Sequence, residues 1–479
     1  MRAILAALIA SALGGGCYRP SVEACQLQCN HQQCPNGLAC NEQGFCASSA
    51  TAQCDSLPVD APADADETKI TIEVLDRTGV PLKGAVVVLA DRAGAQIEEK
   101  VTGPDGIVTS DAVAGSSATV LRAVSDAAAG DVLYATTYLD LWGGAHLVSQ
   151  PDPDARTRSV NIKWTPSAAA NQYEIRTSCV APPTTVPGGV TSFDVQIPTR
   201  CTTFDVVVFA GPQNTNPPPM SVVLGGQTGS SVVMPATWQS SIQVPATITG
   251  KPTNSSTLTS SIGGWITPAV PSTATFSSTT IDSGTPISPW RAPPGMSYTV
   301  QTAVPGVDPR LPNGTQTVIQ RLAAGATSYT RNLDGILIPW TGNATFDRAA
   351  GTLSWLALEP QGLTTVATPN IVMAELGFTR GTARVVWRVI APGTFVTTTV
   401  LNGITMATLP FPVVPGMRGL ELTPNDQITV DHAITMHVAD TAVHRVIELF
   451  EQRRFEITSY VPTIDHFTFS QTPSSSTMP

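Results

Sequence analysis

Cysteine is the residue type whose spacing suggests the most chemistry in this sequence. The chain contains nine cysteines, and six of them crowd into residues 25–54. The nine are Cys17, Cys25, Cys29, Cys34, Cys40, Cys46, Cys54, Cys179 and Cys201. So short a segment cannot build its own hydrophobic core, and cysteines of exported chains are oxidised, so we expect disulfides there. A zinc site that also uses His31 is the alternative, but the Cys-x-x-Cys pair that usually clamps zinc is absent. The sequence leaves the pairing within residues 25–54 open.

Three cysteines lie outside this cluster: Cys17, Cys179 and Cys201. If Cys17 is modified and the six clustered cysteines pair among themselves, Cys179 and Cys201 remain for each other. The chain between them leaves a predicted strand at 173–176, forms proline- and glycine-rich loops and returns through another at 193–197, so the two can approach to disulfide distance. A reactive thiol pair is the alternative, but the Cys-x-x-Cys spacing and a flanking cation at the start of a helix are absent. We therefore predict a Cys179–Cys201 disulfide.

Histidines and acids do not form a recognisable catalytic or metal-binding pattern. The sequence has no Gly-x-Ser-x-Gly, His-Glu-x-x-His, phosphate loop or dinucleotide fingerprint. His432 and His437 are five residues apart, which puts them on opposite faces of a strand. His432 then shares a face with Ile434, Met436 and Val438 and is expected to pack rather than bind metal. We predict no catalytic residue, no metal site, no cofactor and no enzymatic activity.

The first seventeen residues have the layout of a secretion signal: one arginine, an apolar run from residue 3 to 13, then three glycines and Cys17. The run is shorter than the roughly 20 residues that a membrane-spanning helix needs. Residues 14–17 resemble the lipobox of bacterial lipoproteins, which implies a diacylglyceryl group on Cys17. Tyr18, where an aspartate would resemble an inner-membrane retention signal, points to the outer membrane. Ordinary cleavage at residues 10–12, leaving a free thiol, is the alternative.

Composition restricts the function classes. Of 479 residues only 13% are charged, the formal net charge is −10, and glycine and proline number 38 and 40. An acidic chain with scattered cations is a poor partner for nucleic acid. Few charges and many turn residues disfavour long surface helices and favour many short strands. We expect an all-β protein that does not bind nucleic acid.

Three further resemblances concern the parts of the chain. The string from Cys34 to Cys46, with turn formers between cysteines, resembles the cysteine-rich stubs that follow the lipobox in predicted lipoproteins of Gram-negative soil bacteria. An alternating strand at 70–74 and an apolar strand at 84–89, followed by a turn at 102–106, resemble carboxypeptidase-regulatory-like and bacterial Ig-like modules over residues 68–125. The spacing of Trp164 and Tyr173 is similar to that of the core anchors of fibronectin type III domains.

These observations predict a fold class of tandem β-sandwich modules, Ig-like or fibronectin III-like, after a small disulfide-rich stub. Four tryptophans lie beside Gly or Pro, as loop aromatics do: Trp142, Trp265, Trp290 and Trp340. Because most tryptophans of β-sandwiches are core residues, a binding platform is the less favoured interpretation of these four. The predicted segments are 1–16 signal peptide, 17–54 lipidated stub, 55–67 acidic linker, 68–155 Ig-like sandwich, 156–237 sandwich with one disulfide, 238–344 Ser/Thr/Pro-rich β module and 345–479 C-terminal sandwich. In the last segment we expect strands at 353–358, 371–378, 384–390, 395–401 and 427–438.

The sequence therefore favours a lipid-anchored cell-envelope protein with a structural or binding role, in the outer membrane or on the cell surface. Its expected partners are the membrane, through the anchor, and a surface protein or glycan. A surface adhesin or carbohydrate-binding protein is a sharper alternative. A secreted hydrolase with an unrecognised site is a second alternative.

Overall fold

The computed structural model of the chain divides into two compact units, Met1–Asp66 and Glu67–Pro479. It describes residues 39–40, 46–47 and 49 of the first unit and most of residues 69–471 of the second. The gaps in the second are 77–79, 112–114, 127–129, 142–144, 150–156, 169, 179, 200, 213–218, 266–274, 282–289, 309, 311–313, 323–325, 381–382, 402–403, 413–419, 421, 424 and 439–465. Residues outside the description therefore include the predicted signal peptide, the linker, Cys17, Cys25, Cys29, Cys34, Cys54 and Cys179.

In the first unit, two short strands form an antiparallel pair. Strand β1 (Ala39–Cys40) pairs with β2 (Cys46–Ala47), so that Cys40 and Cys46 lie opposite each other in the backbone register. The predicted disulfides of this stub stay predictions.

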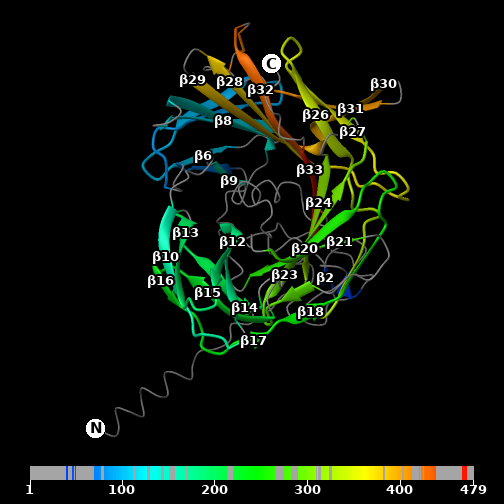
Figure 1. Cartoon of the computed structure of the whole chain (residues 1–479). Coiled ribbons are helices and arrows are strands. Elements are labelled where there is room, and N and C mark those ends of the chain that lie inside the picture. Colours follow the sequence, from blue (N-terminus) through cyan, green and yellow to red (C-terminus); the bar gives the residue numbers. More distant parts are fainter. Residues whose placement is uncertain are drawn as a thin grey trace. The chain divides into compact units, whose positions relative to one another are not determined.

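The described part of the chain is built from strands joined by turns, which confirms the all-β prediction (Figure 1). Its one helical element is a single 3₁₀ turn, η1 (Gly393–Phe395). Among the described residues there is no helix with the length and hydropathy needed to cross a bilayer.

The largest sheet of the described strands has twelve members. In spatial order they are β21 (Thr275–Ile281), β20 (Leu258–Trp265), β23 (Ser297–Pro305), β24 (Thr315–Leu322), β33 (His466–Gln471), β32 (Gln427–Val438), β28 (Ile371–Arg380), β29 (Ala383–Pro392), β8 (Gly130–Leu141), β7 (Ser116–Asp126), β4 (Val86–Ala90) and β5 (Gln96–Val101). Neighbours are antiparallel except β29 and β8, which run parallel from Arg384 beside Val132 to Ile390 beside Tyr138. Strands from three of the predicted modules therefore share one sheet.

Two smaller sheets pack on this one. The first is β6 (Ile107–Asp111), β3 (Lys69–Val74) and β9 (His146–Ser149); the second is β26 (Trp340–Asp347), β27 (Thr352–Leu358), β31 (Ile404–Pro410) and β30 (Thr397–Leu401). Ile72, Tyr138 and Met436 belong to the core shared with the first small sheet. Trp355 and Val372 belong to the core shared with the second. Because β26 runs through residues 344 and 345, the third and fourth predicted modules are continuous there.

Residues 157–240 form a sandwich of two sheets around their own core. Its strands are β13 (Ser192–Pro198), β10 (Thr157–Lys163) and β16 (Ser231–Val233) in one sheet, and β12 (Val180–Pro187), β11 (Gln172–Thr177), β14 (Phe204–Gly211), β15 (Met220–Gln227) and β17 (Gln239–Ser240) in the other. Trp164 and Tyr173 are buried in that core, with ring centroids 5.2 Å apart, as their spacing indicated. The Tyr173 hydroxyl accepts a hydrogen bond from the Ser167 amide at 2.9 Å.

Four short strands complete the description: β18 (Ile242–Val244) pairs with β22 (Trp290–Ala292), and β19 (Ala246–Thr249) pairs with β25 (Tyr329–Asn332). Trp290 and Trp340 lie in strands and are fully buried, so these two are core tryptophans rather than loop aromatics. The Trp340 indole donates a hydrogen bond to the Val304 carbonyl at 3.0 Å, which satisfies its polar atom inside the core.

Candidate functional site

The 3₁₀ turn η1 separates two pockets of the second unit. A strand was expected to begin at Phe395, but β30 begins only at Thr397 because η1 comes first. Gly393 permits this turn: its amide donates to the Asn370 carbonyl at 2.8 Å, and a Cβ there would lie 2.1 Å from the Pro369 carbonyl oxygen. Gly393 and Val396 line one pocket, and Phe395 lines the other.

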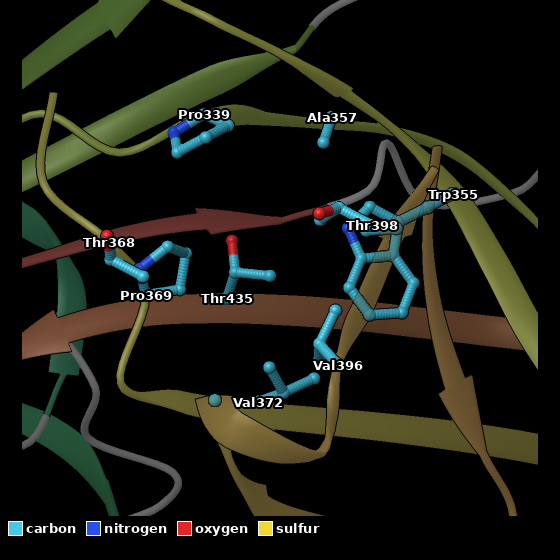
Figure 2. A pocket seen from close by; sticks show the side chains of 11 residues that line it. Pro339, Trp355, Ala357, Thr368, Pro369, Val372, Val396, Thr398 and Thr435 are labelled. Carbon is cyan, nitrogen blue, oxygen red and sulfur yellow. The ribbon is translucent and has the colours of Figure 1, made fainter. Parts of the chain in front are cut away.

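We call the first pocket the threonine cavity. It has a volume of about 210 Å³ and lies between the large sheet and the β26–β27–β31–β30 sheet (Figure 2). Its described lining residues are Pro339, Trp355, Ala357, Thr368, Pro369, Val372, Gly393, Val396, Thr398, Ala407 and Thr435.

One wall of the threonine cavity is a row of residues across three neighbouring strands. Trp355 of β27 lies opposite Ala407 of β31, which in turn lies opposite Thr398 of β30. Leu353 and Leu409, the next cross-strand pair on that face, fill the core with two large side chains. At Ala407 only a methyl group is present, so the space beside the Trp355 ring stays open.

The opposite wall belongs to the large sheet, where Val372 of β28 lies directly opposite Thr435 of β32. The Thr435 hydroxyl lies 2.8 Å from that of Thr341, and the Thr341 amide donates to the Ser470 hydroxyl oxygen at 2.8 Å. These hydrogen bonds tie β26 to β32 and β33, and they fix the position of the Thr435 side chain at the cavity.

The rim of the threonine cavity is fastened to the end of β32. The Thr368 carbonyl oxygen lies 2.8 Å from Nδ1 of His437. The Asn370 side chain donates to the Val438 carbonyl at 2.9 Å and accepts from the Val438 amide at 3.1 Å. His437 therefore has a positioning role at the rim, on the face opposite Ile434 and Met436, as the sequence predicted.

The chemistry of this cavity follows from its lining. None of the described lining residues carries a charge; apolar groups predominate, and three threonines add hydroxyl or carbonyl oxygens. A sealed, empty cavity of 210 Å³ would destabilise a core by about 5 kcal/mol on the scale measured for large-to-small substitutions. An opening at the rim reduces this cost and gives a ligand a way in. The arrangement is suited to binding, and its described lining includes no cysteine, serine, histidine or carboxylic acid.

We call the second pocket the Asp140 pocket. It has a volume of about 170 Å³. Its described lining residues are Asp91, Arg92, Ala93, Gly94, Gly115, Ser117, Leu139, Asp140, Phe395, Pro410, Phe411 and Pro412. A Cβ placed on Gly115 would lie 3.8 Å from both the Arg92 Nε and the Asp140 Oδ1. The guanidinium and the carboxylate therefore flank the same point, and the glycine keeps that point open.

Asp140 has an unusual backbone. With a φ of 59° it is the one described non-glycine residue in the left-handed region. It lies where the pairing of β8 with β7 shifts register between Ser116 and Ala118, at a β-bulge. Phe411, which lines the same pocket, packs edge-on against Trp387 with ring centroids 5.1 Å apart. An acid, a base and an aromatic wall thus meet in this pocket.

A third polar group lies on the other face of the large sheet. The buried Glu375 carboxylate accepts a hydrogen bond from the Arg388 guanidinium, and His432 is paired with Glu375 in the strand register. Burial raises the pKa of the nearby Asp431 carboxyl, with a smaller contribution from the negative charge of Glu375. No group of three or more potential metal ligands occurs among the residues that the structure describes. Glu375 and Arg388 thus form a buried ion pair within the sheet.

Cys201 is buried and disulfide-bonded. Because Cys179 lies outside the described residues, the pairing of these two cysteines stays a prediction, which non-reducing peptide mapping can test. Cys201 is not among the described lining residues of the threonine cavity or of the Asp140 pocket.

Sequence reasoning missed both pockets. The sequence feature that comes nearest to predicting the threonine cavity is the pair of alanines at 357 and 407, each within a strand. An alanine in a strand indicates a cavity only when the residues of the facing sheet are known. The Asp140 pocket joins residues from the start of the second unit to residues near 411, and the pattern of neither segment predicts the other.

No protein-family model and no curated protein matches the chain. Among solved structures, the Bacillus anthracis TIE protein is 10% identical, with a TM-score of 0.15, and the match covers 55% of this chain and 49% of that one. The pilus adhesin SpaC from Lactobacillus rhamnosus GG is 7% identical, with a TM-score of 0.15 and coverage of 68% and 43%. The major pilin SpaD from Corynebacterium diphtheriae is 8% identical, with a TM-score of 0.14 and coverage of 57% and 98%. The chain thus spans about half or less of the first two. At such TM-scores these likenesses carry no argument.

Proposed function

We propose that this chain is a lipid-anchored binding protein of the bacterial cell envelope, without catalytic activity. The observation that carries the binding role is the threonine cavity, a defined space between two sheets with an uncharged described lining. The signal-like start and the lipobox-like residues 14–17 support the anchor. The absence of an Asp after Cys17 favours the outer membrane, where the protein would meet surface partners.

Radiolabelled palmitate tests the anchor in the full chain. We expect the wild type to take up label and to fractionate with the outer membrane. Cys17→Ala should lose the label and leave the membrane fraction, whereas Cys201→Ser, the matched control, should keep both. A Cys17→Ala protein that remains membrane-bound would show that another feature holds the chain there.

Protease treatment of intact cells tests the proposed place on the surface. A surface-exposed chain should be degraded without cell lysis, while a periplasmic marker protein in the same cells survives. Protection of the chain until lysis would restrict it to the inner face of the outer membrane and remove the adhesin alternative.

A second candidate function, carbohydrate binding, is favoured by the Asp140 pocket. A carboxylate accepts hydrogen bonds from sugar hydroxyls and a guanidinium donates to them, and Asp140 and Arg92 flank one open point. Phe395 and Phe411 line the same pocket and can contact the apolar face of a sugar ring.

A glycan array with the solubilised full chain tests this candidate. We expect binding that Asp140→Asn and Arg92→Gln each reduce by about tenfold, the usual effect of losing a charged hydrogen-bond partner. Asp111→Asn, an exposed acid outside the pocket, is the control and should change nothing. Signals that survive both pocket variants would place any glycan elsewhere on the chain.

A further inference from the structure

We infer that the threonine cavity binds a small, uncharged, mainly apolar molecule that carries one hydroxyl group. This inference rests on the proposed binding role and specifies the class of ligand.

The lack of charge comes first in the argument. No described lining residue of the cavity can neutralise an ionised ligand. Moving a carboxylate or ammonium group from water into such a space is costly, because the ion loses its hydration and finds no opposite charge there. The cavity therefore discriminates against ions and favours neutral molecules.

Two threonines define where a ligand's polar group lies. Figure 2 shows the Thr398 hydroxyl on one side of the cavity and the Thr435 hydroxyl on the other, with the Trp355 ring beside them. A hydroxyl can donate one hydrogen bond and accept two. The Thr435 hydroxyl lies 2.8 Å from the Thr341 hydroxyl and 3.5 Å from the Ser470 carbonyl oxygen, so it keeps capacity to accept a further hydrogen bond. A ligand hydroxyl can donate to one threonine and accept from the other. A purely apolar ligand would forgo both of these hydrogen bonds.

The size of the ligand follows from the alanines. Ala357 and Ala407 leave the space beside Trp355 unfilled, and the resulting volume is about 210 Å³. Apolar cavities of about 150 Å³ in a protein core bind benzene. The threonine cavity therefore has room for a six-membered ring with a short hydroxylated side chain.

Three probes of one shape test the inference on the full chain by isothermal titration calorimetry. Cyclohexylmethanol is neutral, cyclohexanecarboxylate is its anionic analogue and cyclohexylmethylamine is cationic at neutral pH. We expect the alcohol to bind at least about tenfold more tightly than either ion, because an ion loses its hydration without gaining a partner.

Four variants then locate the site. Ala407→Leu fills the space and should abolish alcohol binding, and Ala357→Val should do the same more mildly if the leucine variant fails to fold. Thr398→Val removes one hydroxyl and should weaken binding about fivefold. Thr399→Val changes the neighbouring threonine, which alternates to the other face of β30, and should leave the affinity unchanged.

Each alternative result has a definite meaning. Tighter binding of the carboxylate or the amine, with loss in Ala407→Leu, would overturn the ligand class and leave the binding role intact. No binding of any probe to a folded wild type, or alcohol binding that persists in folded Ala407→Leu, would overturn the inference. The membrane anchor is measured by palmitate labelling and fractionation, so its failure is seen independently of these titrations.

Discussion

The threonine cavity and the Asp140 pocket lie on the two sides of one 3₁₀ turn, yet their chemistry is opposite. Their volumes, about 210 and 170 Å³, differ little. The described lining of the first is uncharged, whereas that of the second includes Arg92 and two aspartates. The two spaces therefore differ in which charges line them more than in how large they are.

The two pockets also differ in what positions their side chains. The central residues of the threonine cavity, Trp355, Val372 and Ala407, are buried in paired strands and have little freedom. Arg92 lies in the turn between β4 and β5, and its side chain is exposed. The buried wall of the first pocket is therefore preformed, whereas the exposed Arg92 side chain of the second would lose rotamer freedom on binding, which adds an entropic cost there.

The largest expected effect concerns two alanines of one core. Replacing each by leucine should change the free energy of unfolding in opposite directions. Ala374 lies on the same face of β28 as Val372 but away from the cavity, in fully packed surroundings. Ala374→Leu should lower the free energy of unfolding by about 3 kcal/mol through overpacking. Ala407→Leu should raise it by about 1 kcal/mol because it fills a void. Denaturant unfolding followed by tryptophan fluorescence measures both.

Circular dichroism of the two leucine variants serves as the control for an intact β fold. If Ala407→Leu destabilises the protein as strongly as Ala374→Leu does, there is no usable space beside Trp355.

The second prediction concerns the backbone of Asp140. Glycine adopts its left-handed conformation without steric cost, so Asp140→Gly should raise the free energy of unfolding by about 0.5 kcal/mol while it removes glycan binding. Asp140→Ala should lose the same binding and lower stability, because alanine keeps the steric cost and offers no local hydrogen bond. Thermal unfolding monitored by calorimetry, alongside the glycan array, compares the two; equal shifts for both variants would mean that the backbone there is unstrained.

The smallest expected effect is the contribution of the partly buried Asp431 carboxyl to the pH dependence of stability. Burial raises the pKa of Asp431 above its ordinary value, so the folded state holds a proton more tightly than the unfolded chain does. The contribution of Asp431 to stability is therefore complete below the unfolded pKa and is lost as the pH rises through the folded pKa. Asp431→Asn should raise the melting temperature slightly at pH 7 and have no such effect at pH 3. The reverse pattern would indicate that Thr429 and Arg384 stabilise the carboxylate more than burial destabilises it.

Local patterns in the sequence predicted strands well, and long-range pairing poorly. The strand predicted at 427–438 is β32 itself, and Trp164 with Tyr173 forms the core that their spacing indicated. The parallel pairing of β29 with β8 joins segments that are remote in the chain, and it depends on packing between sheets rather than on either segment's alternation. For the same reason the threonine cavity, which needs Ala407 of one sheet to face Val372 of another, has no signature in the sequence.

Crystals of the full chain soaked with 4-bromobenzyl alcohol test the central claim most directly, because bromine can be located by its anomalous scattering. We predict one bromine peak within the threonine cavity, with the ligand hydroxyl between Thr398 and Thr435, and no peak in crystals of Ala407→Leu. A peak in the Asp140 pocket instead, or an unoccupied threonine cavity at saturating ligand, would contradict the account.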